Sequence, residues 1–207
     1  YINLIVNNNN NVKTLSLPSP FKKENFKVLV DNSTSFIYKD RLLTIDKISD
    51  YILTFSKKRK GNYMVFCPSY KYLETLKLVL KDDDLNIIYQ EKNMTNVSKD
   101  LFLSEFKEKV NKTTVGVVVL GGIFSEGIDL VGDRLNGVII LGIGLPSISF
   151  ENELKKEYYN SLSYNGFEYA YINVGINKIT QALGRLIRSE NDKGIALLID
   201  YRYKNKT

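Results

Sequence analysis

Apolar residues recur along the chain with two periods, and these periods predict strands and helices in alternation. Short apolar runs predict strands over residues 26–30, 62–66, 85–89, 115–120, 137–141 and 195–199. The runs at 115–120 and 137–141 are apolar almost throughout, which is typical of strands buried on both faces of a parallel sheet.

Apolar residues at spacings of three and four predict helices between these strands. They indicate helices over 44–58, from Ser69 onward, over 98–110 and over 151–162. A longer helix is expected to lead to Arg188, with a buried face formed by Ile172, Ile176, Ile179, Leu183, Leu186 and Ile187. Strands that alternate with helices imply βαβ units with right-handed crossovers. The sequence therefore predicts a doubly wound α/β domain.

The composition allows a folded domain and excludes several kinds of catalytic site. The chain has 207 residues, of which 43% are hydrophobic, so it can bury a sizeable core. It contains one cysteine, Cys67, and no histidine. No disulfide, zinc site or iron–sulfur cluster can therefore be built within the chain, and no metal site is expected. Catalysis by a Ser-His-Asp or Cys-His system is excluded for the same reason.

Charge and patterning give expectations about partners and location. The formal net charge of +6 favours a polyanionic partner. No stretch approaches the length of a membrane span and no signal peptide is visible, so no membrane contact is expected and a cytoplasmic location is predicted. Residues 1–20 are poorly patterned and are interpreted as a connecting segment from an upstream domain, while 21–207 form the predicted domain.

The loop after the strand at 62–66 is the first candidate site. In open α/β sheets ligands gather at the carboxyl ends of strands. Here Ser69 and Tyr70 open a helix, and a helix N-terminus with a hydroxyl suits a phosphate group. On position alone, a structural interpretation is stronger, with Ser69 as the helix cap and Tyr70 as a packing residue.

The loop after the strand at 115–120 is the second candidate site. The glycines of 122–127 are spaced as in a Walker A loop, but Ile128 and Asp129 stand where Lys and Ser or Thr are required. The loop is therefore not a P-loop, and it offers backbone N–H groups with the side chains of Ser125, Glu126 and Asp129. A structural alternative, in which Asp129 caps a turn, stays open.

The segment QALGRLIR at 181–188 ends the last predicted helix. Arg185 and Arg188 fall on neighbouring helical positions, and a guanidinium carries a permanent charge and a donor fork that suit phosphate. Gly184 lowers helix stability, so a close approach at this residue is expected. Taken alone, the simpler interpretation is an amphipathic helix that ends in solvated arginines.

Taken together and in this order, the segments at 61–70, 121–130 and 181–188 resemble motifs IV, V and VI of superfamily-two helicases of the DinG/XPD type. The flanking sequences SPFKKEN at 19–25 and DKGIALLIDYR at 192–202 match as well. This resemblance implies the C-terminal motor domain of an ATP-dependent DNA helicase, with a RecA-like (P-loop NTPase-like) three-layer fold and a mainly parallel sheet.

The resemblance also implies roles for individual residues. Nucleic-acid contacts are implied for Ser69, Tyr70, Ser125 and, with a less clear role, Glu126. Nucleotide contacts are implied for Gly127, Asp129, Gln181, Arg185 and Arg188. The two arginines are further implied as catalytic fingers, which stabilise charge on the transferred phosphate. Structural roles in ion pairs or turns are expected for the GIGLP turn at 142–146 and for Asp192, Asp200 and Arg202.

Partners follow from the same resemblance. ATP would bind between this domain and an absent N-terminal helicase domain, which would carry the Walker motifs, the Mg²⁺ ligands and, as in many relatives, any iron–sulfur cluster. Single-stranded DNA is the implied track. Two alternatives remain: a nucleic-acid-binding module without ATPase activity, and an unrelated doubly wound enzyme for a phosphorylated small molecule. The second is weakened because no glycine-rich fingerprint follows the first strand.

Overall fold

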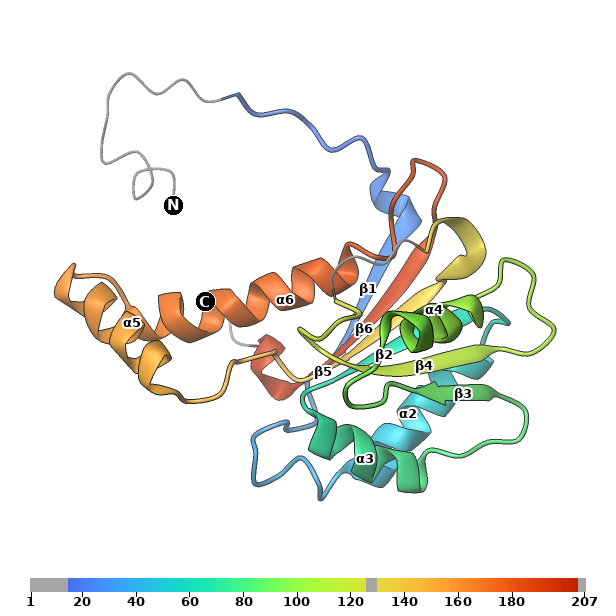
Figure 1. The fold of residues 1–207 in the computed structure, drawn as a ribbon. Helices are drawn as coiled ribbons and strands as arrows, with labels where there is room; N and C mark the ends of the chain where they lie inside the picture. Colours follow the sequence, from blue (N-terminus) through green and yellow to red (C-terminus); the bar gives the residue numbers. More distant parts are fainter. Residues whose placement is uncertain (1–14, 126–129, 205–207) are drawn as a thin grey trace.

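The computed structural model of the chain describes residues 15–125 and 130–204, which form a six-stranded sheet with helices on both faces (Figure 1). The strands are β1 (Phe26–Asp31), β2 (Asn62–Cys67), β3 (Asn86–Tyr89), β4 (Thr114–Val119), β5 (Gly137–Leu141) and β6 (Gly194–Ile199). Their order in the sheet is β1-β6-β5-β2-β4-β3, and every described pair is parallel. The predicted strands and the predicted parallel sheet are confirmed.

Helices fill the connections between these strands. They are α2 (Ile45–Lys57), α3 (Tyr70–Val79), α4 (Asn96–Ser104), α5 (Phe150–Ser161) and α6 (Asn173–Leu183). Shorter helical turns are η1 (Lys23–Asn25), η2 (Gly132–Arg134), the π-helical η3 (Glu168–Ile172) that runs into α6, and η4 (Tyr201–Lys204). Among the described helices, none has both the length and the apolar character that crossing a membrane requires.

Helix α4 is shorter than the helix predicted over 98–110. It ends at Ser104, and Phe106 then turns inward to become 1% exposed. The side chain of Arg134 donates from Nε to the carbonyl oxygen of Phe106 at 3.0 Å and from Nη2 to that of Leu103 at 3.4 Å. A distant arginine thus satisfies carbonyl groups that another helical turn would have used.

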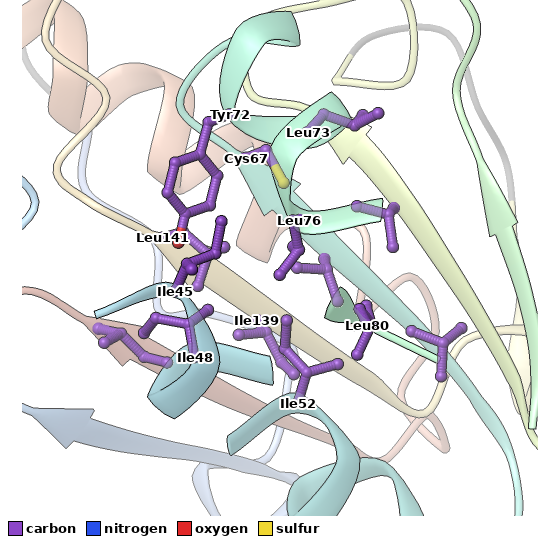
Figure 2. Packing of buried hydrophobic residues seen from close by; sticks show 14 of the residues in the cluster. Ile45, Ile48, Ile52, Cys67, Tyr72, Leu73, Leu76, Leu80, Ile139 and Leu141 are labelled. Atoms are coloured by element: carbon purple, nitrogen blue, oxygen red, sulfur yellow. The ribbon is translucent and has the colours of Figure 1, made fainter. Parts of the chain in front are cut away.

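Strand β2 lies inside the sheet and sends alternate side chains into two cores. Tyr63, Val65 and Cys67 pack with residues of α2 and α3 on one face, part of which Figure 2 shows. Met64 and Phe66 pack with residues of α4 and α6 on the other face. All five side chains are at most 2% exposed. Full burial of such a side chain contributes roughly 1.5–3 kcal/mol, so the three layers are held together largely through β2.

Helix α6 does not bury the predicted face in full. Ile179 is 7% exposed and belongs to the core, but Ile176 is 50% exposed. The contact face runs instead through the buried Gly175 and Ala182. A Cβ atom at Gly175 would lie 2.4 Å from the carbonyl oxygen of Ile143, so the glycine lets α6 touch the backbone after β5. The prediction counted large apolar side chains and therefore missed this contact.

We expect Gly175→Ala to destabilise the chain by about 1–3 kcal/mol, because the added methyl group would overpack against backbone atoms. Gly184→Ala is the matched control, since Gly184 has φ −63° and a Cβ atom there would lie 3.3 Å and 3.5 Å from carbonyl oxygens of its own helix. Chemical denaturation measures both free energies of unfolding. Equal losses in the two variants would show that α6 is not held against the turn after β5.

Candidate functional site

The candidate loops meet at the carboxyl edge of the sheet. Ser69 lies just after β2, and residues 121–125 follow β4. Strands β2 and β4 pair directly, with Cys67 opposite Val119, so the chain brings motif IV and motif V side by side. This is the edge at which open α/β sheets bind ligands.

Ser69 and Tyr70, the last two residues of motif IV, both make structural contacts. The hydroxyl of Ser69 accepts a hydrogen bond from the backbone N–H of Tyr72 at 3.2 Å, so its role as a helix cap is confirmed. The hydroxyl of Tyr70 accepts from Nε2 of Gln90 at 2.5 Å, and Oε1 of Gln90 accepts from the N–H of Val119 at 2.8 Å.

Gln90 was not foreseen as a site residue. It is 1% exposed and ties the tyrosine of motif IV to the end of β4. No local pattern marks this glutamine, because its function depends on which strands lie next to one another in the sheet.

Ser125 holds the motif V loop from inside the protein. Its side chain is fully buried, and its hydroxyl accepts from the N–H of Gly121 at 2.7 Å. Gly121 has φ +75°, a conformation that favours glycine, and a Cβ atom there would lie 3.0 Å from the Lys178 side chain. The structure therefore shows a shaping role for the Ser125 hydroxyl, and its predicted contact with nucleic acid stays a prediction. Glu126, Gly127 and Asp129 lie outside the described residues.

Motif VI does not end a helix as predicted. Helix α6 ends at Leu183, with Gly184 as its C-cap, so Arg185 and Arg188 lie in the segment after the helix. The N–H of Gly184 donates to the carbonyl oxygen of Thr180 at 2.8 Å, and the N–H groups that follow bond three residues back rather than four. This tightening of the last turn is a common way to end a helix.

The arginines of motif VI differ in their surroundings. Arg185 is half-buried, and its Nη2 donates to the carbonyl oxygen of Ser125 at 2.6 Å. Arg188 is exposed, as is Gln181 in the last turn of α6. The contact between Arg185 and Ser125 joins motif VI to motif V across 60 residues of sequence.

Asp192 fixes the segment that carries Arg188. Its Oδ2 accepts from the N–H of Arg188 at 2.7 Å and from that of Ser189 at 2.8 Å, and its Oδ1 accepts from the Ser189 hydroxyl at 2.7 Å. Burial acts to raise the pKa of Asp192, but these hydrogen bonds outweigh it and hold the pKa below its usual value. The expected structural role of Asp192 is confirmed.

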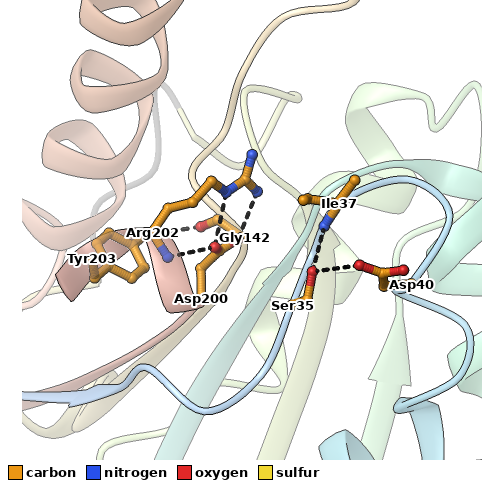
Figure 3. A network of polar contacts seen from close by, with 7 residues as sticks. All are labelled: Ser35, Ile37, Asp40, Gly142, Asp200, Arg202 and Tyr203. Atoms are coloured by element: carbon orange, nitrogen blue, oxygen red, sulfur yellow. Dashed lines mark hydrogen bonds and ion pairs between the residues drawn. The ribbon is translucent and has the colours of Figure 1, made fainter. Parts of the chain in front are cut away.

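Asp200 and Arg202 form the expected ion pair at the carboxyl edge (Figure 3). Asp200 is fully buried and accepts from Nε of Arg202 at 2.8 Å and from Nη2 at 2.6 Å. The hydroxyl of Tyr203 donates to the carbonyl oxygen of Gly142 at 2.8 Å, where the backbone has φ +85°. These contacts lock the ends of β5 and β6 together.

Size alone does not locate the site. A hollow of about 400 Å³ lies at the amino edge of the sheet, beside Tyr63 and Gly194, and its lining includes none of the predicted site residues. In the described part of the chain, no group of His, Cys, Asp and Glu side chains is arranged to hold a metal ion. The carboxyl edge is therefore defined by its contacts and charges.

A six-stranded parallel sheet with the loops of motifs IV and V at its carboxyl edge is the fold of RecA-like helicase domains. The chain belongs to the helicase C-terminal domain family, whose model matches residues 52–207. The solved structure named XPD_Helicase shares the fold with a TM-score of 0.69 and 22% identity, over 87% of this chain and 32% of that one.

Two relatives are similar to this chain in sequence. The ATP-dependent DNA helicase DinG of Photobacterium profundum is 30% identical over 201 residues, covering 93% of this chain and 28% of the relative. The ATP-dependent DNA helicase CHL1 of Candida albicans is 27% identical over 223 residues, covering 94% and 26%. The resemblance to DinG/XPD-type helicases is confirmed, and the chain spans less than a third of the length of these relatives.

We expect Asp192→Asn to lower the free energy of unfolding at neutral pH by about 1.5–3 kcal/mol, because Asn has one acceptor oxygen where both oxygens of Asp192 accept hydrogen bonds. Because the native pKa of Asp192 is lowered, its contribution is present above the unfolded pKa and is lost as pH falls through the native pKa. The difference between wild type and variant should therefore shrink as the solution is acidified. Denaturant titrations at several pH values measure it, with exposed Asp83→Asn as the control. A pH-independent difference would contradict this account.

Proposed function

We propose that this chain is the second motor domain of an ATP-dependent DNA helicase. In this proposal it contributes motifs IV, V and VI to translocation on single-stranded DNA and to ATP hydrolysis at a cleft shared with an N-terminal motor domain. The contact between Arg185 and the Ser125 carbonyl oxygen carries the proposal, since it brings the arginine segment to the loop after β4. The names of the relatives, ATP-dependent DNA helicases, support it further.

The arginines are suited to act on a transferred phosphate. The bond to Ser125 fixes one nitrogen of the Arg185 guanidinium, and Asp192 fixes the backbone of Arg188. Cations that are held in place beforehand need little reorganisation when charge develops on a phosphate. In the proposed site, Arg185 and Arg188 therefore contact the nucleotide phosphates, while Gln181, Gly127 and Asp129 keep their proposed nucleotide contacts.

The site fits a nucleotide only in part. The described residues offer cations for phosphate but no acidic cluster for Mg²⁺. We therefore assign the Mg²⁺ ligands, and any iron–sulfur cluster, to the N-terminal domain. ATP supplies the transferable phosphoryl group, and this chain supplies positioned positive charge. A cytoplasmic location remains part of the proposal.

Hydrogen bonds connect the proposed nucleotide and nucleic-acid contacts. Tyr70 of motif IV is tied through Gln90 to the N–H of Val119 at the end of β4. The loop that follows β4 leads to Ser125, whose carbonyl oxygen binds Arg185. A shift of Arg185 on nucleotide hydrolysis would therefore displace the loops that we propose to contact DNA.

In the full-length parent, we expect Arg185→Ala and Arg188→Ala to lower kcat for ATP by on the order of a thousandfold or more, as loss of an arginine finger does. Arg→Lys should not rescue either variant, because the planar fork is lost. The KM for ATP should change little in both variants. The melting temperature should change little in Arg188→Ala and fall modestly in Arg185→Ala, which also loses the bond to the buried Ser125 carbonyl oxygen. The control is Arg59→Ala, which removes an exposed arginine elsewhere. Steady-state rates of ATP hydrolysis with single-stranded DNA present test this prediction. A wild-type kcat in both arginine variants would refute the proposal.

We expect Ser69 to contact DNA as well as cap α3. Ser69→Asp keeps a capping acceptor but repels phosphate, so it should weaken binding of a single-stranded oligonucleotide without lowering the melting temperature. Ser69→Ala should weaken binding by roughly 0.5–1.5 kcal/mol. Ser125→Ala should weaken binding together with stability, since its hydroxyl holds the loop.

Ser149→Ala is the matched control for these serine variants. Ser149 caps α5 through the N–H of Asn152, so its loss should lower stability alone. Anisotropy titrations and thermal melts on the same preparations separate the two effects. Unchanged affinity in Ser69→Asp would leave Ser69 as a cap only.

A further inference from the structure

A small cavity beside Ser69 is lined mainly by cationic and aromatic side chains, most of which lie outside motifs IV, V and VI. Its volume is about 70 Å³, and it lies where the start of α3 meets the connection between β1 and α2. The lining residues are Tyr38, Arg41, Leu42, Ser69, Lys71 and Tyr72. The cavity therefore adjoins the residue that we assign to the DNA backbone.

The connection that carries Tyr38 and Arg41 is held by hydrogen bonds. The hydroxyl of Ser35 donates to Oδ2 of Asp40 at 2.9 Å and accepts from the N–H of Ile37 at 3.3 Å (Figure 3). The N–H of Arg41 donates to the carbonyl oxygen of Ile37 at 3.1 Å. The turn thus presents both side chains from a defined backbone.

Arg41 carries a charge that the described residues do not neutralise. Its guanidinium lies over the Tyr38 ring, 5.0 Å from the centroid, and its buried Nε has no hydrogen-bond partner within residues 15–125 and 130–204. No described carboxylate forms an ion pair with it. Burial lowers the pKa of Arg41, and the nearby Arg202 acts in the same direction, while Tyr38 and Tyr72 oppose them. An anion in the cavity would stabilise this cation.

The rest of the cavity also favours an oxyanion. Tyr72 is 1% exposed, and its hydroxyl has no hydrogen-bond partner in the described part of the chain. Lys71 lies in the first turn of α3, and Ser69 caps that helix, whose N-terminus carries partial positive charge. Residues that carry cationic or hydroxyl groups therefore line one small volume.

We propose that this cavity binds a backbone phosphate of single-stranded DNA through Arg41 and Lys71, and that Tyr38 stacks on an adjacent base. The inference rests on the proposed function, because it extends the strand contact from Ser69. Tyr38 is 71% exposed, and a cationic groove beside an exposed aromatic ring is how many proteins hold single strands. A free phosphate ion could bind the same cations, but it would make no contact with the exposed Tyr38 ring.

The test measures anisotropy of a labelled oligothymidylate with the full chain over a range of salt concentrations. Arg41→Gln and Lys71→Gln should each weaken binding and reduce the slope of log affinity against log salt by about 0.7, the value for one contact to a single strand. Arg59→Gln and Lys77→Gln remove equal charge at exposed positions, Lys77 on the same helix, and should keep the wild-type slope.

Tyr38 is tested in the same titrations. Tyr38→Ala should weaken binding roughly fivefold to a hundredfold with the salt slope unchanged, because stacking releases no counterions. Tyr38→Phe should retain most of the affinity. Thermal melts accompany every variant, and since Lys71 and Tyr38 are exposed, their variants decide the question even if Arg41→Gln unfolds.

The other possible results contradict either this inference alone or the proposed function as well. If Lys71→Gln and Tyr38→Ala bind as wild type does while Ser69→Asp binds weakly, this inference fails and the proposed function stands. If the wild-type chain binds no oligothymidylate, both fail. Titration calorimetry with inorganic phosphate distinguishes a free-anion site. Phosphate binding that requires Arg41, together with oligothymidylate binding that does not, would make the cavity such a site and refute the strand contact.

Discussion

Burial of β2 on both of its faces is the constraint on which the rest of the structure depends. Its alternate side chains enter the core under α2 and α3 and the core under α4 and α6. Its neighbours β4 and β5 are fixed by pairing with it. Because all described strands are parallel, this central position also places the loops after β2 and β4 side by side. The hydrophobic core thus determines where polar chemistry can occur, without contributing any of it.

In the loops at the two ends of the strands, buried polar groups take over from apolar packing. Ser125, Gln90, Asp192 and Asp200 are all nearly or fully buried, and each binds a backbone N–H group or an arginine. Removing one partner of such a bond leaves a buried group unsatisfied, which costs about 1–3 kcal/mol. These residues therefore set the shapes of loops that apolar burial cannot specify, and motif residues near them gain defined positions.

The sequence predicted the strands to within one residue at each end, because apolar runs report burial directly. It extended α4 too far and carried α6 through to Arg188, since both ends depend on tertiary contacts or on a glycine cap that periodicity does not show. The motifs were found through resemblance, yet the burial of Ser125 was not. The link made by Gln90 and the cavity beside Arg41 were missed because both arise only when distant segments meet. Local patterns thus predicted the helices and strands, whereas the contacts around the candidate site depend on the tertiary fold.

The two groups of cations to which we assign ligands differ in how they are held. Arg185 is bonded to the loop after β4, and a carboxylate anchors the backbone of Arg188. Arg41 instead rests on an aromatic ring beside a cavity, with its Nε unsatisfied by the described residues. In the proposed function, the first group meets a nucleotide that changes charge during hydrolysis, so rigid placement serves it. The second meets a DNA strand that must be held and released in turn. A cation on an aromatic ring suits that purpose. The proposed contact of Arg41 with a phosphate and the proposed stacking of Tyr38 on a base both bind the strand without base-specific hydrogen bonds.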